Sequence, residues 1–155
     1  MLYLWGLYPR GVYWDRGKGG VELAEQQRLI TDFVNRHVWA VVGASQDRSK
    51  FGNRVFRSLR DAGYTVYAVN PKGGELEGTK VYPSLADLPQ LPEVIDLVVP
   101  PSVTEQVVKE AHRLGLTRIW MQPGAESEAA ITYCHEQGIQ VVDGACAMVW
   151  KRRWT

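Results

Sequence analysis

The fold is decided by one stretch of the sequence, Val38-Trp39-Ala40-Val41-Val42-Gly43-Ala44-Ser45. Its first five residues form a short apolar run rich in β-branched side chains, which is typical of a strand buried on both faces. A turn of small residues follows at once, and a helix is expected from about Asn53, with Gly63 as its C-cap. Strand, small-residue turn and helix in this order indicate the first βα unit of a doubly wound α/β fold.

The alternation of strand and helix continues through the rest of the chain. Before the first strand, the spacing of apolar residues over 21–36 predicts an amphipathic helix. Ser102 and Glu105 have capping-box spacing and predict the start of a helix that ends near Gly115. We expect a three-layer, doubly wound sheet of five parallel strands with an N-terminal helix. The expected strands are 38–42, 65–69, 94–99, 117–121 and 139–142.

Length and composition narrow the class of protein. A chain of 155 residues is long enough for one domain with a buried core. A formal net charge of +1 gives no reason to expect nucleic acid or a membrane surface as partner. No apolar run approaches the roughly 18–20 residues of a membrane span. The two cysteines are too few for a disulfide framework, so a reducing cytoplasm is the expected compartment.

Residues 1–20 fit this pattern poorly, because their aromatic residues follow neither helical nor strand periodicity. Two interpretations stay open for this extension. It is an aromatic arm that packs on the domain or on a second subunit. Alternatively, Arg16–Gly20 is encoded by a purine-rich stretch resembling a ribosome-binding site, and the natural start lies at Val21 or Leu23. The domain itself is assigned to 21–155.

The order of strands and turns also predicts where a ligand binds. In open parallel sheets, ligands lie outside the carboxyl ends of the strands, where the strand order reverses. Each expected strand here ends in small, proline-containing or polar residues, and all of these ends should lie along one edge. The candidate site residues, in strand order, are Gly43, Ala44, Ser45 and Gln46; Asn70, Pro71 and Lys72; Val99, Pro100 and Pro101; Met121 and Gln122; and Cys146.

The first turn differs from the dinucleotide-binding fingerprint. Gly43 and Gly52 do not form Gly-x-Gly-x-x-Gly, although Gly43 is expected to let a phosphate approach the backbone. An NAD-binding unit carries Asp or Glu at the end of its second strand to bind the ribose hydroxyls. Asn70-Pro71-Lys72 stands there instead, which argues against NAD and leaves NADP open.

Several motifs together resemble the CoA-binding domain family. They are Gly43-Ala44-Ser45, Gly63-Tyr64, Val69-Asn70-Pro71-Lys72, Tyr82-Pro83-Ser84-Leu85 and Val98-Val99-Pro100-Pro101. The resemblance covers about Val38 to Met148. Members are small stand-alone Rossmann-like proteins, similar to the N-terminal domain of the succinyl-CoA synthetase α subunit and of ADP-forming acyl-CoA synthetases. The resemblance therefore implies coenzyme A or an acyl-CoA as the ligand.

The resemblance also implies roles for individual positions. Residues 43–46 match the loop that contacts the CoA nucleotide and its phosphates, and Lys72 matches a lysine that reaches a CoA phosphate. Residues 99–101 match an apolar turn beside the adenine, and Met121 and Gln122 line the groove toward the pantetheine arm. Lys50, with Arg48 and Arg54, is a further phosphate candidate or part of a solvated basic loop.

No catalytic or metal-binding constellation stands out in the sequence. The phosphorylatable histidine of the synthetases lies in a later domain, and the three histidines here have no such setting. Small family members carry Asp-Arg-Cys after the last strand, whereas Gly144-Ala145 precedes Cys146 here. Cys146 is either a small buried residue or a thiol able to exchange with the thiol of CoA.

The expected function is therefore non-catalytic binding of CoA or acyl-CoA. Two alternatives stay open: an NAD(P)-dependent oxidoreductase or redox sensor, and a scaffold subunit of a separate acyl-CoA synthetase. A homodimer or a synthetase partner chain is compatible with all three.

Overall fold

The structure is a computed structural model and describes residues 20–154. The expected extension at 1–20 lies outside the described residues except for Gly20, with which the first helix begins. The two interpretations of that extension therefore stay predictions. Within residues 20–154, no helix is long and apolar enough to cross a membrane.

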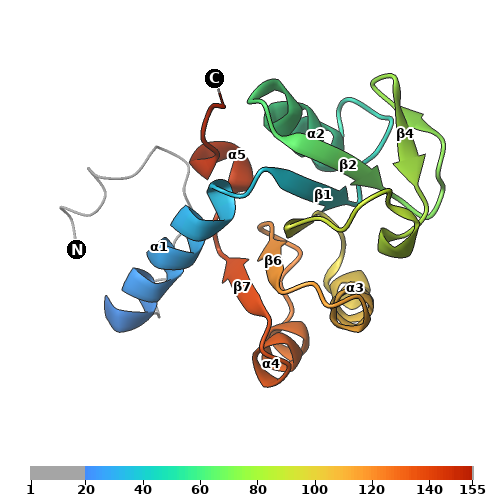
Figure 1. The fold of residues 1–155 in the computed structure, drawn as a ribbon. Helices are drawn as coiled ribbons and strands as arrows, with labels where there is room; N and C mark the ends of the chain where they lie inside the picture. The colour runs from blue at the N-terminus through green and yellow to red at the C-terminus, as the bar shows by residue number, and fades with distance from the viewer. Residues whose placement is uncertain (1–19, 155) are drawn as a thin grey trace.

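The core of the fold is a parallel sheet of five strands in the order β2-β1-β5-β6-β7 (Figure 1). All of the expected strands are present and parallel, which confirms the predicted fold class. Their bounds are β1 Val38–Val42, β2 Thr65–Val69, β5 Val94–Leu97, β6 Arg118–Met121 and β7 Gln140–Asp143. The chain runs outward from β1 on one side and then returns to the other side through β5, so the strand order reverses between β1 and β5.

The expected number of strands was wrong, because the sheet has seven strands. β4 (Thr79–Tyr82) pairs parallel to β2, and β3 (Glu75–Leu76) pairs antiparallel to β4. The two short strands are joined by Glu77 and Gly78, whose φ angles of +49° and +78° form the two-residue turn that suits a β-hairpin. Leu76 is buried and anchors this hairpin on the core.

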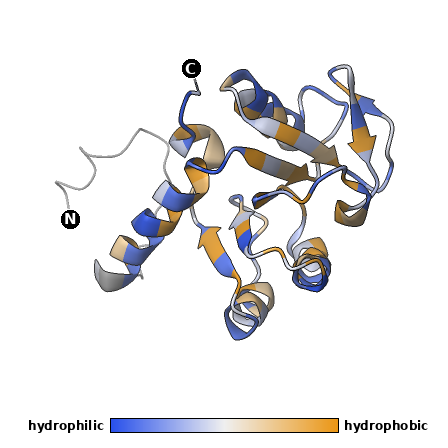
Figure 2. Cartoon of the chain, in the orientation of Figure 1, coloured by the Kyte–Doolittle hydropathy of each residue, from blue (hydrophilic) through white to orange (hydrophobic). Residues whose placement is uncertain are grey.

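Helices cover both faces of the sheet and complete the three predicted layers (Figure 1). Figure 2 shows hydrophobic and hydrophilic residues alternating around the first helix, α1 (Gly20–Val34), the pattern expected of a helix with one buried face. A short 3₁₀ turn at Leu85–Asp87 follows β4. One face is covered by α1 (Gly20–Val34), α2 (Phe51–Asp61) and α5 (Ala147–Trp150), and the other by α3 (Pro101–Arg113) and α4 (Glu128–Glu136).

The predicted capping box at the start of α3 was wrong. The helix begins at Pro101, with Pro100 as its N-cap residue, and no side chain caps it. Proline suits the first helical position because that N–H has no partner within the helix. Glu105 accepts a hydrogen bond of 2.6 Å from Ser127 Oγ, the hydroxyl at the N-cap of α4. Glu105 therefore connects two helices rather than closing its own.

The C-terminal segment is tied to the core through one buried hydroxyl. Tyr64 Oη donates to Val34 O at 2.6 Å and accepts from the backbone N–H of Arg152 at 3.0 Å. The backbone N–H of Trp154 donates to Ala62 O, and the Trp154 ring packs edge-on against Tyr64. A single side chain thus joins α1, β2 and the end of the described chain.

We predict that Tyr64→Phe lowers the free energy of unfolding by about 1–3 kcal/mol, because two backbone groups lose their partner. The matched control is Tyr67→Phe, whose hydroxyl accepts from Gln90 Nε2 at an exposed position, with an expected loss below about 0.5 kcal/mol. Urea denaturation of both variants measures the difference. Equal losses would show that Tyr64 contributes only its ring.

Candidate functional site

The turns that follow β1 and β5 are in direct contact at the point where the strand order reverses. Gly43 has a φ of +94°, and a Cβ built on it would lie 2.0 Å from Val98 O and 2.8 Å from Val99 Cγ1. A Cβ on Gly52, in the first turn of α2, would lie 2.2 Å from Gly43 O. Both glycines are therefore required by backbone packing, a reason that the sequence analysis did not find for Gly43.

Asn70 connects the turn after β2 to the turn after β1. Its Nδ2 donates to Ala44 O at 2.9 Å, and its Oδ1 accepts from the backbone N–H of Lys72 at 3.0 Å. Ala44 is buried beneath this contact, whereas Pro71 and Lys72 are exposed. The Asn70 amide is thus used to hold two turns together, and Lys72 projects from the second of them.

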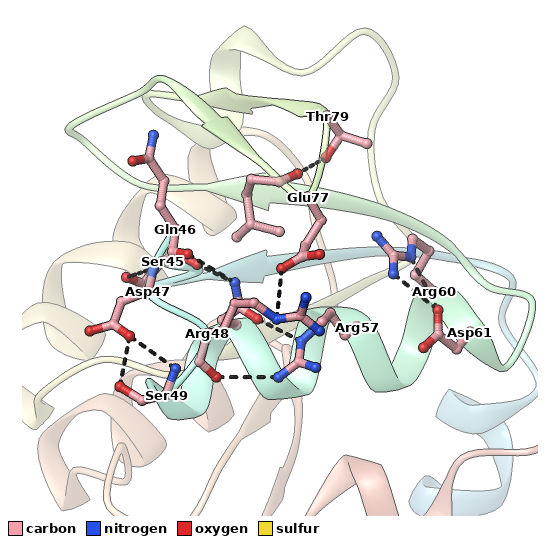
Figure 3. A network of polar contacts seen from close by, with 12 residues as sticks. Ser45, Gln46, Asp47, Arg48, Ser49, Arg57, Arg60, Asp61, Glu77 and Thr79 are labelled. Atoms are coloured by element: carbon pink, nitrogen blue, oxygen red, sulfur yellow. Dashed lines mark hydrogen bonds and ion pairs between the residues drawn. The ribbon is translucent and has the colours of Figure 1, made fainter.

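The segment between the first turn and α2 is held by further hydrogen bonds (Figure 3). Asn53 Nδ2, in the first turn of α2, donates to Ser45 O at 2.7 Å, and Ser45 Oγ accepts from the backbone N–H of Asp47 at 3.1 Å. Gln46 lies against the turn after β2, because a Cβ on Gly74 would be 2.7 Å from Gln46 Nε2. Lys50, the N-cap residue of α2, is exposed.

These contacts bring one group of the predicted site residues together at the carboxyl edge of β1, β2 and β5. The turn after β5 contributes an apolar wall, in which Val99 is half-buried while Pro100 and Pro101 are exposed. The grouped residues are Gly43, Ala44, Ser45, Gln46, Lys50, Asn70, Pro71, Lys72, Val99, Pro100 and Pro101. We call this set the three-turn edge.

The residues predicted at the ends of β6 and β7 are placed differently. Met121 and Gln122 are fully buried. Gln122 Nε2 donates to Asp96 Oδ2 at 2.9 Å, and its Oε1 accepts from the backbone N–H of Ala147 at 3.3 Å. Cys146 is half-buried at the N-cap of α5. Met121 and Gln122 thus face the interior, where Gln122 holds α5 against the sheet.

Asp96, on β5, is a buried polar residue that the sequence analysis missed. Its side chain is fully buried, and Oδ1 has no hydrogen-bond partner. Burial raises the pKa of Asp96 to about 8, against the weaker opposing effect of the hydrogen bond from Gln122. The carboxyl is therefore protonated at neutral pH. A lone acidic residue inside the apolar run Val94–Leu97 was the signal that could have identified it.

Chemically, the three-turn edge offers backbone groups, a cation and an apolar wall. Burial raises the pKa of the Cys146 thiol, against a weaker opposing effect of the hydrogen bond from the Met148 backbone, which leaves little thiolate at neutral pH. Among residues 20–154, no three His, Cys, Asp or Glu side chains are grouped as metal ligands. A hollow between α3 and α4 is lined by residues outside the predicted set.

Comparison with known proteins gives a family match and relatives of very different length. Residues 37–152 match the model of a family described as a CoA binding domain. The ADP-forming acetate–CoA ligase I of Archaeoglobus fulgidus is 41% identical over 76 residues, which are 49% of this chain and 11% of the ligase. The matched half of this chain therefore corresponds to about a tenth of that relative's length.

Solved structures include both small and large proteins. A conserved hypothetical protein from Pyrococcus furiosus is 42% identical with a TM-score of 0.70, covering 73% of this chain and 97% of the other. The dinucleotide-forming acetyl-coenzyme A synthetase 1 of Ca. Korarchaeum cryptofilum is 30% identical with a TM-score of 0.61. That match covers 72% of this chain and 26% of the synthetase.

We predict that Gly43→Ala lowers the free energy of unfolding by more than about 4 kcal/mol, because its Cβ meets the Val98 carbonyl. Gly124→Ala is the matched control. Gly124 has a φ of +96° and open space around it, so only the left-handed strain of about 1–2 kcal/mol is expected. Chemical denaturation measures both values, and similar losses would contradict the proposed contact between the turns.

We also predict that the stability of the protein falls as pH rises from about 4 to about 8, because folded Asp96 keeps a proton that the unfolded chain releases. Relative to Asp96→Asn, the wild type should lose about 1.4 kcal/mol per pH unit in this range. Urea denaturation from pH 5 to pH 8 tests this, with Asp61→Asn at an exposed position of α2 as control. Parallel profiles for wild type and Asp96→Asn would refute it.

Proposed function

The chain belongs to the CoA binding domain family, and we propose that it binds coenzyme A or an acyl-CoA at the three-turn edge and performs no chemistry of its own. The single observation that carries the proposal is the Asn70 bridge between the turns after β1 and β2. This bridge places the exposed Lys72 beside the Gly-Ala-Ser turn, where the strand order reverses.

The residues of this edge match the chemical parts of the ligand. CoA carries a pyrophosphate and a phosphate on its ribose, and such anions are bound well by backbone N–H groups together with a cation. The N–H of Gly43 already donates to Val69 O, so the proposed donors are the N–H groups of Ala44, Ser45 and the N-terminus of α2, and Lys72 supplies the cation. Val99 and Pro100 offer the apolar surface that an adenine requires.

The state of the Cys146 thiol and the Asp96 carboxyl supports binding without catalysis. Cys146 is a weak nucleophile at neutral pH because burial raises the pKa of its thiol. Asp96 is enclosed by the core, so its carboxyl has no route to a bound substrate as a base. Neither group favours the alternative of a redox sensor or an oxidoreductase.

One second candidate is favoured by a specific observation. Because the match covers only about a tenth of an ADP-forming ligase, the chain is suited to act as the CoA-binding part of an assembly with a separate synthetase chain. We propose the cytoplasm as its compartment and either a separate synthetase chain or a second copy of this protein as its partner. Affinity purification from the source cell tests the assembly, and a preparation free of any synthetase chain would count against it.

Calorimetry of the purified protein with CoA, acetyl-CoA, dephospho-CoA, NAD, NADPH and ATP tests the proposed function. We expect CoA and acetyl-CoA to bind more tightly than the other four ligands, because only they combine the ribose phosphate with the pantetheine arm. Tightest binding of NADPH would favour the oxidoreductase alternative. Absence of heat with every ligand would refute a nucleotide site.

Lys72→Ala should weaken CoA binding by about 10- to 100-fold, the effect of losing one charge-assisted contact. Dephospho-CoA should be affected much less if Lys72 contacts the ribose phosphate. Lys109→Ala, at an exposed position on α3, removes the same charge and should leave both affinities unchanged. Equal weakening of both ligands by Lys72→Ala would assign the lysine to the pyrophosphate instead.

A further inference from the structure

An ion pair joins the segment after β1 to the turn of the β3–β4 hairpin. Arg48 Nε lies 3.5 Å from Glu77 Oε1, and the two side chains point toward each other across the top of α2 (Figure 3). The two partners differ in accessibility, because the Arg48 side chain is 67% exposed and the Glu77 side chain only 17%. Because the Arg48 guanidinium is exposed and the two atoms lie as far as 3.5 Å apart, water screens the pair and its attraction is weak.

The backbone of Arg48 is fixed to the three-turn edge by a chain of hydrogen bonds. Arg57 Nη2 donates to Arg48 O at 3.2 Å, and Arg57 Nε donates to Asn53 Oδ1 at 2.7 Å. Asn53 in turn donates to Ser45 O, within the Gly-Ala-Ser turn. The position of Arg48 relative to the candidate phosphate site is therefore set, while its side chain stays exposed.

Glu77 is fixed more firmly than its partner. It occupies the left-handed region with φ +49° in the two-residue turn between β3 and β4. Leu76, immediately before it, is buried in the core, and Thr79 Oγ1 donates to Leu76 O at 2.8 Å. The backbone that carries Glu77 is therefore held by the hairpin and the core, and its side chain is the less exposed of the two partners.

The pair lies on the ribose side of the proposed ligand. Two residues of the loop after β1 contact the segment that follows β2. Gln46 lies against Gly74, and Arg48 forms the ion pair with Glu77. In doubly wound folds, the end of the second strand is where the ribose of a nucleotide is bound. A phosphate on that ribose would come within reach of an arginine that is currently paired with a carboxylate.

We propose that Arg48 is a second cation for the ribose phosphate of CoA, and that Glu77 is the anion the phosphate displaces. The inference rests on the proposed function and adds a specificity residue to it. A phosphate dianion forms shorter and stronger charge-assisted contacts with a guanidinium than one carboxylate oxygen at 3.5 Å. Glu77 thus lowers the affinity for ligands that carry the ribose phosphate, because that phosphate must displace it from Arg48, and it has little effect on ligands without the phosphate.

The test compares Glu77→Gln with the control Asp61→Asn. The Asp61 carboxylate pairs with Arg60 on α2 at 3.1 Å, so the control also removes a carboxylate from an ion pair. Titration calorimetry at fixed low salt uses CoA and dephospho-CoA as ligands. Glu77→Gln should raise CoA affinity about 3- to 10-fold and dephospho-CoA affinity less than about 2-fold, while Asp61→Asn changes neither. An equal gain for both ligands, or no gain over Asp61→Asn, would overturn the proposal.

A double-mutant cycle tests whether Glu77 acts through its contact with Arg48 or through general repulsion between its charge and the ligand. Arg48→Ala should lower CoA affinity about tenfold, with Arg60→Ala as the matched control without effect. In the Arg48→Ala background, Glu77→Gln should give no further gain. A gain that persists without Arg48 would overturn the assignment of Arg48.

The two proposals fail in distinguishable ways. Wild-type protein that binds CoA but shows no difference between Glu77→Gln and Asp61→Asn overturns the role of the ion pair alone. Wild-type protein that binds no CoA overturns both. Because Arg48 is exposed, Arg48→Ala should keep the wild-type melting temperature, which confirms that a change in affinity is not a change in folding.

Discussion

The fold and its candidate site depend on one close contact between two turns. The backbone of Gly43 lies so near the Val98 carbonyl that no side chain fits between them, and Gly52 brings α2 equally close from the opposite direction. This contact stands where the strand order reverses, between β1 and β5. The same spacing that closes the core therefore leaves the Gly-Ala-Ser turn and the helix N-terminus at the carboxyl edge of the sheet. Hydrogen bonds from Asn70 and Asn53 then secure the neighbouring segments.

Most of the fold could be predicted because local sequence and tertiary packing favour the same structure. The five parallel strands are apolar runs that end in Gly, Pro or polar residues, and such runs leave little choice of element. The β3–β4 hairpin was missed because its strands are too short for a periodic signal, although Glu77-Gly78 is a suitable turn. The capping box at Ser102 and Glu105 misled because spacing alone cannot show that Glu105 has a better partner, Ser127, on another helix.

The candidate site was predictable to the extent that it depends on strand ends. Residues that directly follow β1, β2 and β5 do gather, as the topology requires. Gln122 could not be placed from sequence, because its burial follows from the need to pair the Asp96 carboxyl and the Ala147 N–H. Arg48 was a phosphate candidate from sequence alone, but its ion pair with Glu77 was hidden, since that pair depends on a hairpin that the sequence did not indicate. Polar contacts between segments far apart in the sequence are thus the features that could not be predicted.

An edge with a fixed backbone and exposed cations, beside a half-buried thiol and a buried carboxyl, is suited to hold a charged ligand rather than to transform it. The most direct test of this view is an NMR titration of the ¹⁵N-labelled protein with CoA. The account predicts that the amide shifts cluster in residues 43–48, 72–78 and 98–99, since the prolines of these turns have no amide N–H. Shifts centred on the hollow between α3 and α4, with those three segments unchanged, would contradict it.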